Sequence, residues 1–555
     1  MTVRRIAWAA TAGILVLLFY VPLTRILAEG LRADSGWSLS TLRSLIADPY
    51  IVRVLVFTLK QAAWSTLLAV AIGLPGALLL ARYRFPGRRV VRAMTVLPFV
   101  MPAVTVALGF VLFWGRSGAV NHLLMSWFGF SSPPVRVLYS MWGIVLAHAF
   151  YNAPVITRVV GAVWEGIDPE LDEAAASLGR GPWRRAIGVT LPLLTPALVS
   201  GAALVFVLCF LSFPIVLALG GARFATVEVE IYTLIRTLLD PQRGAALILV
   251  ETVLSLALAY LYLRSEAAIA VPNIGRRQAA LRPLFAKPVS CSRVVLLVYA
   301  TFALVFFAGP IAAMIVDSLR RGAEGGWLTA HYRFLMTAGY NPLLGVSPLG
   351  ALANSLVVAT ASTALAVPLG FAVSLFAVRS RVIGHRAMEV LLMAPLAMSS
   401  IAVGYAILRG FGGIVHGLGW WTALAIAHGI LHYPFVARVL RPAVEAMDPE
   451  QIDAARALGA RALRRLWTIE LPSVWRGLIA ATVFAFALSM GEMSAAIVLL
   501  RPGSATLPLA IHSLLAARQF GAASAMAVVL IGVTAMCFIA MEWMGTALQG
   551  LRWEG

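Results

Sequence analysis

Long apolar runs constrain the fold of this chain more than any other feature of its sequence. Of its 555 residues, 61% are hydrophobic and only 12% are charged. A soluble domain of this size needs far more surface charge, so most of the chain must face lipid or other apolar helices. Apolar runs of about 18 or more residues predict transmembrane helices. We count six in each half, at 6–27, 55–81, 90–113, 137–164, 198–219 and 244–263, and at 293–316, 351–378, 387–409, 418–440, 477–499 and 521–543.

We therefore expect an all-α membrane protein with about 12 transmembrane helices. The first run follows Arg4 and Arg5, and its length favours a retained signal anchor over a cleaved signal peptide. The net charge of +20 comes from arginines in short loops beside the apolar runs, which argues against nucleic-acid binding. The cysteines Cys209, Cys291 and Cys537 fit no disulfide or metal spacing.

The loop arginines predict the orientation of the spans. Cytoplasmic loops of membrane proteins are enriched in arginine and lysine, and most of the loop cations gather on one side when the N-terminus is placed inside. These cations are Arg82, Arg84, Arg88, Arg89, Arg92, Arg180, Arg184, Arg185, Arg276, Arg277, Arg282, Lys287, Arg379, Arg381, Arg386, Arg456, Arg461, Arg464 and Arg465. We expect both termini to be cytoplasmic.

A polar segment between two apolar runs occurs twice. The first copy, at 165–192, reads EGIDPELDEAAASLGRGPWRRAIGVTLP, and the second, at 445–472, reads EAMDPEQIDAARALGARALRRLWTIELP. Twelve identities lie at a constant offset of 280 residues without a gap. The repeat continues outside the segments, since His148 matches His428 at the same offset and Gly87 matches Gly384 at an offset of 297.

The repeat predicts the domain organisation. We expect a first repeat over 1–270, a cytoplasmic linker over 271–292 and a second repeat over 293–555. An even number of spans in each half gives the two repeats the same orientation. They should then be related by a pseudo-twofold axis along the membrane normal, with a pathway at their interface.

Each polar segment has the pattern of a short exposed helix. Asp168 and Pro169 are residues typical of a helix start, and Gly179 suits a helix end that needs positive φ. Between them Leu171, Ala174, Ala175 and Leu178 recur at helical spacing, and the small residues allow a partner to approach closely. A second short helix is expected from Pro182 to Val189. An interfacial helix lying on the bilayer is the alternative, but the stripe lacks large anchoring aromatic residues.

The segment resembles the EAA loop of bacterial ABC importer permeases, and the resemblance covers nearly the whole chain. It is carried in the first copy by Glu173–Ala174–Ala175, Gly179, Val189 and Leu191–Pro192, and in the second by Asp453–Ala454–Ala455, Gly459, Ile469 and Leu471–Pro472. The first copy departs by Val for Ile and the second by Asp for Glu. Two such loops in one chain resemble the fused permeases of the ferric iron and thiamine importers. RFPGR at 84–88, LAHAFYNAP at 146–154 and LCFLSFPIVLALGG at 208–221 look most like the thiamine permease, whereas the stretch 489–508 is shared more broadly with iron-type permeases.

The resemblance implies a fold of two parallel six-helix repeats, a function and a set of partners. In that family the EAA loop is the coupling helix that sits in a groove of a cytoplasmic ATP-binding subunit. Coupling would then fall to Asp168, Glu173, Ala174, Ala175, Leu178 and Gly179, and to Asp448, Asp453, Ala454, Ala455, Leu458 and Gly459. The implied partners are a dimer of ATP-binding subunits and an extracytoplasmic solute-binding protein, and the implied location is the bacterial inner membrane. Thiamine or its phosphates are the expected substrates, with ferric iron or another small solute as the alternative.

The chain itself shows no sign of an ATPase or of an enzyme. Its only two lysines, Lys60 and Lys287, lie outside any glycine-rich phosphate loop, so we expect no cofactor here and ATP hydrolysis by a separate subunit. An ion-coupled secondary transporter of twelve spans is a rival class, although it would not need matched docking helices. A membrane redox or lipid enzyme is a second rival.

A few polar residues fall inside the apolar runs, where charge is costly. Glu492 lies in the eleventh run, and its repeat mate is Ser212. Together with Phe213, which can stack on an aromatic cation, these residues are candidates for the translocation pathway; helix packing is the alternative for Glu492. Glu251 has no polar repeat mate, and packing or pairing with an arginine is expected. We expect interhelical hydrogen bonds rather than haem ligation from His148 and His428.

Overall fold

The expected spans are present as helices. The computed structural model of the chain describes residues 2–33, 36–94, 101–267, 281–285, 291–320, 329–380 and 384–550. Within these residues eleven helices are long and apolar enough to cross a membrane. A twelfth span is formed by Ala387–Ala397 and Ser400–Gly412 if this pair, bent by 98°, is counted as one. Part of the third expected run, 95–100, lies outside the described residues, as do Arg276, Arg277, Lys287 and Arg381. The chain is an all-α membrane protein.

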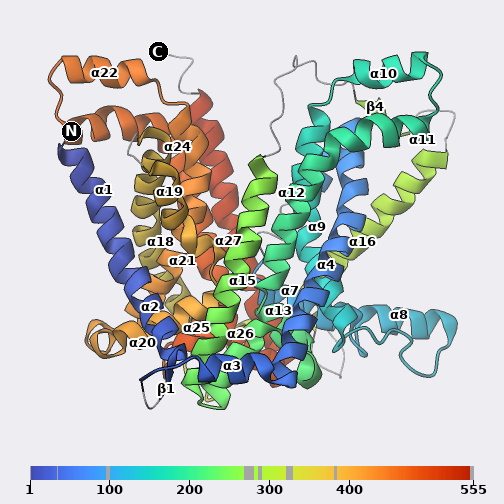
Figure 1. Cartoon of the computed structure of the whole chain (residues 1–555). Helices are drawn as coiled ribbons and strands as arrows, with labels where there is room; N and C mark the ends of the chain where they lie inside the picture. Colours follow the sequence, from blue (N-terminus) through green and yellow to red (C-terminus); the bar gives the residue numbers. More distant parts are fainter. Residues whose placement is uncertain are drawn as a thin grey trace. The chain divides into compact units, whose positions relative to one another are not determined.

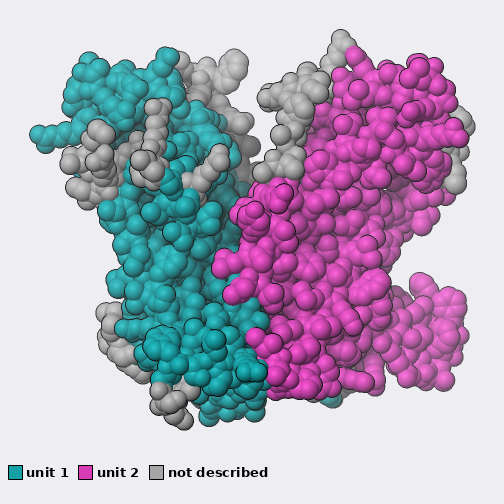
Figure 2. All heavy atoms as spheres, in the orientation of Figure 1, with its two compact units in different colours: residues 1–45, 231–252, 318–555 teal, residues 46–230, 253–317 magenta. Residues whose placement is uncertain are grey.

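The chain forms two compact units (Figure 2). Unit 1 contains Met1–Leu45, Ile231–Thr252 and Ser318–Gly555, and unit 2 contains Ile46–Glu230 and Val253–Asp317. Each unit therefore holds most of one half of the chain together with the first span of the other half. The boundaries expected for the two sequence repeats, 1–270 and 293–555 with the linker 271–292, stay a prediction.

Unit 2 is built almost entirely of helices (Figure 1). Its elements are α4 Pro49–Arg82, β3 Tyr83–Arg84, α5 Arg88–Met94, α7 Ala103–Trp114, α8 Ala119–Phe128, α9 Met141–Glu165, α10 Pro169–Ser177, α11 Pro182–Arg185, the π-helical turn η2 Ala186–Thr190, α12 Leu191–Phe210, α13 Pro214–Leu219, the 3-10 turn η3 Gly221–Arg223, most of α14 Val227–Tyr232, the second part of α15 Pro241–Ala267, β4 Arg282–Pro283 and α16 Cys291–Leu319.

Unit 1 has the same character. Its elements are α1 Thr2–Leu15, the π-helical turn η1 Val16–Tyr20, α2 Val21–Gly30, β1 Arg32–Ala33, β2 Gly36–Trp37, most of α3 Ser40–Ala47, the π-helical turn η4 Thr233–Thr237, the first part of α15, α17 Ala330–Thr337, α18 Pro348–Arg379, α19 His385–Met393, the 3-10 turn η6 Ala394–Ala397, α20 Ser400–Leu418, α21 Trp420–Glu445, α22 Pro449–Ala457, α23 Ala462–Arg465, the π-helical turn η7 Leu466–Glu470, α24 Leu471–Gly491, α25 Ser494–Leu499, α26 Leu507–Ala516 and α27 Phe520–Gly550.

The core of each unit is a closely packed helix pair, α4 with α9 in unit 2 and α18 with α21 in unit 1. A Cβ added at Gly73 of α4 would lie 2.6 Å from the Ala153 carbonyl oxygen of α9. A Cβ added at Gly370 of α18 would lie 2.5 Å from a methyl carbon of Val436 of α21. Gly73 and Gly370 are repeat mates at the offset of 297. Helices in a membrane gain most of their association energy from such close approach, so glycine at these positions allows the two backbones to pack.

The first span of each half packs with the body of the opposite half. In unit 1 the Arg409 guanidinium of α20 donates to both carboxylate oxygens of Glu29 of α2, at 3.1 and 2.6 Å. In unit 2 the Tyr299 hydroxyl of α16 donates to the Ile72 carbonyl of α4 at 2.7 Å. This pairing of distant segments decides which residues share a compact unit.

Two very short sheets accompany the helices. β1 pairs antiparallel with β2 in unit 1, and β3 pairs parallel with β4 in unit 2. β4 belongs to the segment joining the two halves. Next to it the buried Leu284 packs with Leu79 and Leu296 and donates its backbone N–H to the Arg84 carbonyl at 3.0 Å. The described part of the linker is therefore anchored to the end of α4.

Both expected spans that follow a polar segment are interrupted. The run 198–219 ends as a helix at Phe210, and α13 starts again at Pro214; the run 477–499 breaks between Gly491 and Ser494. These breaks correct the expectation of continuous helices. α10, α11, η2, α13 and their counterparts α22, α23, η7 and α25 begin and end at equivalent positions, 280 residues apart.

Candidate functional site

The two polar segments fold into short helices with the expected starts. α10 begins after Asp168, whose carboxylate accepts from the Glu170 N–H at 2.9 Å, and α22 begins after Asp448, which accepts from Glu450 at the same distance. A side chain in this position satisfies one of the N–H groups left unpaired at a helix start, and its charge favours the positive end of the helix dipole. The N-cap prediction is confirmed in both copies.

The helix ends are equally alike. Gly179 has φ of +78° and Gly459 has φ of +76°. A residue with a side chain is strained in this left-handed region, so glycine is the residue suited to close a helix here. A Cβ added at either glycine would meet nothing within 4 Å. The requirement is therefore one of backbone conformation and not of space.

The predicted stripe is divided between two faces. Ala175 and Ala455 are buried against the unit, whereas Ala174 and Ala454 are exposed. Leu178 is 81% exposed and its mate Leu458 is 87% exposed. Exposing a leucine to this extent forgoes about 1.5–3 kcal/mol of burial, and it happens at the same position twice. These two leucines are exposed large apolar side chains at the ends of both short helices.

The acidic residues of the two copies behave differently. Glu173 is exposed, while Asp453 pairs with Arg456 at 2.7 Å on the same helix. In the first copy Arg185 also approaches Asp172 at 3.4 Å, whereas the mate of Asp172 is the buried Ile452. The first short helix is thus held to the following helix by a charge pair, whereas the equivalent position of the second is a buried apolar side chain.

The second expected short helix is not separate. α11, η2 and α12 run on as one apolar helix from Pro182 to Phe210, and α23, η7 and α24 do the same from Ala462 to Gly491. The arginines Arg184 and Arg185 therefore lie on the first turn of a span. The C-terminal part of each polar segment is therefore the start of a span.

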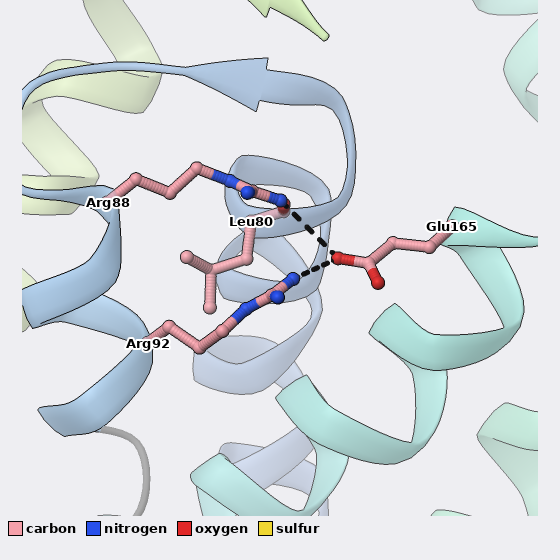
Figure 3. Close-up of polar contacts among 4 residues, drawn as sticks. All are labelled: Leu80, Arg88, Arg92 and Glu165. Atoms are coloured by element: carbon pink, nitrogen blue, oxygen red, sulfur yellow. Dashed lines mark hydrogen bonds and ion pairs between the residues drawn. The ribbon is translucent and has the colours of Figure 1, made fainter. Parts of the chain in front are cut away.

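A cluster of charges joins the end of α9 to α5 in unit 2 (Figure 3). The Arg88 and Arg92 guanidinium groups, one helical turn apart, both reach the same oxygen of the Glu165 carboxylate, and Arg88 does so at 3.4 Å. Arg88 also donates to the Leu80 carbonyl of α4. Burial, followed by the like charge of Arg92, holds the pKa of Arg88 below its usual value, and Glu165 opposes both effects. We call Arg88, Arg92 and Glu165 the α5–α9 clamp.

Unit 1 links the equivalent helices through a different set of charges. Arg441 of α21 donates to Glu389 of α19 and to Glu445, each at 2.9 Å. Glu389 stands at the repeat position of Arg92 and Glu445 at that of Glu165, while Arg441 corresponds to Gly161. The charge at the α19 position is therefore reversed, and an arginine one turn earlier on α21 keeps the two helices linked. The sequence motif contains Glu165 and Glu445 but does not reveal either clamp. The signal that could have found them is the reversal of charge at positions 92 and 389.

The repeated histidines form the expected hydrogen bonds between helices. His148 approaches the Ser65 hydroxyl of α4 at 3.2 Å and the Ser212 hydroxyl at 2.8 Å. His428 approaches Ser489 of α24 at 2.8 Å, and Ser489 also accepts from Ser362 of α18 at 2.8 Å. Buried polar groups need such partners, and here they tie three helices together at the same level of each repeat.

The predicted pathway residues lie at the two breaks. Ser212 and the buried Phe213 sit between α12 and α13. Glu492 sits between α24 and α25, and one of its carboxylate oxygens accepts from the N–H groups of Ser494 and Ala495, at 2.7 and 3.2 Å. Glu492 therefore caps α25, which is the kind of structural role named as the alternative. A place in the pathway stays a prediction for all three residues.

Comparison with known proteins identifies the family. The sequence matches the family described as "Binding-protein-dependent transport system inner membrane component" over residues 73–271 and again over residues 366–550. The chain belongs to this family. The two matches confirm the expected duplication. The permease is therefore a multi-pass inner membrane component of a binding-protein-dependent importer.

Several relatives share most of the length of the permease. It is 30% identical to the thiamine transport system permease protein ThiP of Brucella suis biovar 1 over 80% of its own chain and 79% of that protein. It is 28% identical to ThiP of Salmonella typhimurium over 94% of each chain. One half, 45% of the chain, is 32% identical to 87% of the putative 2-aminoethylphosphonate transport system permease protein PhnU of the same organism. These relatives are transport permeases and not enzymes.

Proposed function

We propose that α10 and α22 are the coupling helices through which cytoplasmic ATP-binding subunits drive this permease. One observation carries the proposal: a capped short helix with an exposed leucine, Leu178 or Leu458, occurs with the same bounds in both units. A lone exposed leucine is ordinary on a protein surface. The repetition of position, cap and terminal glycine is better accounted for by a repeated partner than by chance.

The local connections of α10 favour transmission of force. Its N-terminal side is joined to α9, whose end is held by the α5–α9 clamp. Its C-terminal side leads into the continuous helix Pro182–Phe210, which ends just before Ser212. A displacement of α10 is therefore transmitted both to α9 and to the helix Pro182–Phe210. Through the second helix it reaches the break between α12 and α13. Such a displacement drives transport only when the helices make different contacts with the two states of the ATP-binding subunits.

The proposed substrate is thiamine or one of its phosphates. Relatives named as thiamine permeases match nearly the whole chain, which supports this substrate above others. The match of one half to a permease named for another solute keeps ferric iron or a different small solute as the alternative. We propose cytoplasmic termini, an extracytoplasmic solute-binding protein that delivers the substrate, and ATP use by the partner subunits alone.

Reconstitution in proteoliposomes tests the proposal. The permease, its ATP-binding subunit and its binding protein are expected to accumulate radiolabelled thiamine only when ATP is supplied on the side of the ATP-binding subunit. Competition with thiamine phosphates and with ferric iron then ranks the substrates. Uptake driven by an ion gradient without the ATP-binding subunit would instead establish a secondary transporter.

A backbone substitution tests the coupling helices separately. Gly179→Val with Gly459→Val places branched side chains where φ is positive, which costs about 1 kcal/mol or more at each helix end without creating a clash. Insertion and yield are expected to be normal, while ATP-driven uptake falls strongly. Gly13→Val is the control, because a side chain there also meets nothing within 4 Å. Wild-type uptake and wild-type association with the ATP-binding subunit in the double variant would contradict the assignment.

A further inference from the structure

The helix α8 belongs to an insertion that the function described so far does not use. The repeat offset falls from 297 at Gly87 to 280 at His148, so the first half has 17 additional residues between these positions. In the second half α20 ends at Leu418 and α21 starts at Trp420. In the first half α8 and a loop separate α7 from α9. Figure 1 shows α8 extending sideways from the other helices of unit 2, at the end opposite α10, and Figure 2 shows a protruding lobe there.

One side of α8 is apolar and the other is polar. The residues of the apolar face recur at helical spacing and are Val120, Leu123, Leu124 and Trp127. His122 and Ser126 lie on the other side of the helix. Trp127 is 74% exposed, and Phe128, which follows it, is 68% exposed. Exposed apolar side chains gathered in this way mark a contact with a protein or with a membrane.

A buried side chain holds the start of α8 in place. Asn121 is fully buried, and its amide nitrogen donates to the carbonyls of Gly115 and Val135, both at 2.8 Å. Its amide oxygen accepts from the Val135 N–H at 2.9 Å. These hydrogen bonds join the turn before α8 to the loop after it. The direction in which the apolar face points is therefore set by the protein itself.

The base of α8 lies beside the start of α9. A Cβ added at Gly115 would lie 3.8 Å from a methyl carbon of Leu138, just before α9. Trp142, in the first turn of α9, packs with Trp64 of α4, with ring centroids 5.7 Å apart, and both are about half exposed. Exposed tryptophans on spans gather where lipid meets water. α8 therefore leaves unit 2 close to the level of the membrane surface.

Two cations flank α8. Arg116 precedes the helix, Arg136 lies in the loop after it, and both are exposed. No acidic residue occurs between Asp48 and Glu165, so the insertion carries positive charge only. Arginine beside exposed leucine and tryptophan is the composition of helices that lie in a membrane surface, where the cations reach lipid phosphates. Both the charge and the apolar face of the insertion are thus complementary to phospholipid.

We propose that α8 lies in the surface of the bilayer, in the leaflet opposite α10, with its apolar face among the acyl chains and with Arg116 and Arg136 at the phospholipid phosphates. Phospholipid is favoured over a protein partner because α8 continues from the pair Trp64 and Trp142, which itself marks the membrane surface. By length and composition α7 and α8 together could form one span, Ala103–Phe128, although a turn separates the two helices. The contact holds unit 2 at a fixed depth and depends on neither the proposed substrate nor the proposed coupling helices.

Spin labels on two neighbouring residues of α8 test the proposal. The three native cysteines are replaced by alanine, and Leu123→Cys labels the apolar face while His122→Cys labels the polar face. Both positions are exposed in the permease, so only the surroundings of α8 distinguish them. The permease is placed in nanodiscs of phosphatidylethanolamine and phosphatidylglycerol. Power-saturation EPR then gives the ratio of collisions with oxygen to collisions with a water-soluble nickel chelate. This ratio is expected to be at least about tenfold higher at Leu123, because an interfacial helix buries its apolar face about 5–10 Å deep.

The other outcomes would overturn the proposal. Equal ratios typical of water would leave α8 outside the membrane, and equal ratios typical of lipid would make it part of a span. Immobilisation of the Leu123 label only after the binding protein is added would indicate a protein contact instead. Arg116→Gln with Arg136→Gln is expected to lower the ratio at Leu123 at least about twofold, and no change would overturn the phosphate contact. If Leu123→Cys lowers the yield of folded permease, Trp127→Cys replaces it on the same face.

Discussion

The exposed leucines of the proposed coupling helices give the sharpest prediction. Leu178→Ala removes three apolar carbons, worth about 0.8 kcal/mol each when they are fully buried. Because Leu178 is 81% exposed in the permease alone, nearly all of this gain is still available to a partner, about 2 kcal/mol. The affinity for the ATP-binding subunit should fall about 30-fold for a site in which the leucine becomes fully covered. Leu458, 87% exposed, should behave alike.

The measurement is the dissociation constant between the permease in lipid nanodiscs and the purified ATP-binding subunit. The stability of the permease should change by no more than about 0.5 kcal/mol, because an exposed side chain contributes little to folding. Leu238→Ala is the matched control, since Leu238 is 62% exposed but lies outside both polar segments. Wild-type affinity in Leu178→Ala with Leu458→Ala would refute the reasoning, and so would an equal loss in the control.

Three further predictions follow from the packing and the charges. In the α5–α9 clamp, Glu165→Arg should lower ATP-driven uptake, and adding Arg92→Glu should restore it. A double-mutant cycle of thermal stability should give a coupling free energy of about 0.2–1 kcal/mol, since both groups are half exposed. Strictly additive effects would count against the clamp. His428→Ala leaves Ser489 without one buried partner and should destabilise unit 1 by about 1–3 kcal/mol in thermal unfolding, whereas His122→Ala, at an exposed site, should not. Gly370→Leu forces a side chain against Val436 and should lower the yield of folded protein, while Gly13→Leu is tolerated; equal yields would disprove the close-packing argument.

The spans and the ends of α10 and α22 could be predicted from the sequence because both depend on local chemistry. The free energy of transferring a span into lipid is a sum over consecutive residues, so a run of apolar residues predicts it directly. Asp168 caps α10 by accepting a hydrogen bond from an N–H two residues away, and Gly179 is favoured by the positive φ at its own position. The duplication added a second, independent copy of each of these signals.

The breaks and the clamps could not be predicted in the same way. Hydropathy treats the run 477–499 as one span, yet the chain leaves the helix at Glu492, where the carboxylate bonds to the N–H groups of the next helix. The reverse error concerns Pro182 to Phe210, where polar composition predicted a separate short helix and the backbone continues. In both cases the outcome depends on hydrogen bonds and packing, and the hydropathy of consecutive residues carries no information about these.

What the sequence alone determined is therefore a duplicated bundle of apolar helices with two matched polar segments, because each of these features is encoded by residues close together in the chain. Only the tertiary structure decided that Arg92 meets Glu165 and that Ser400 meets Glu492, which are separated by 73 and 92 positions. Such meetings depend on which helices pack side by side, and the free energy of that packing is spread over many residues that no local pattern identifies.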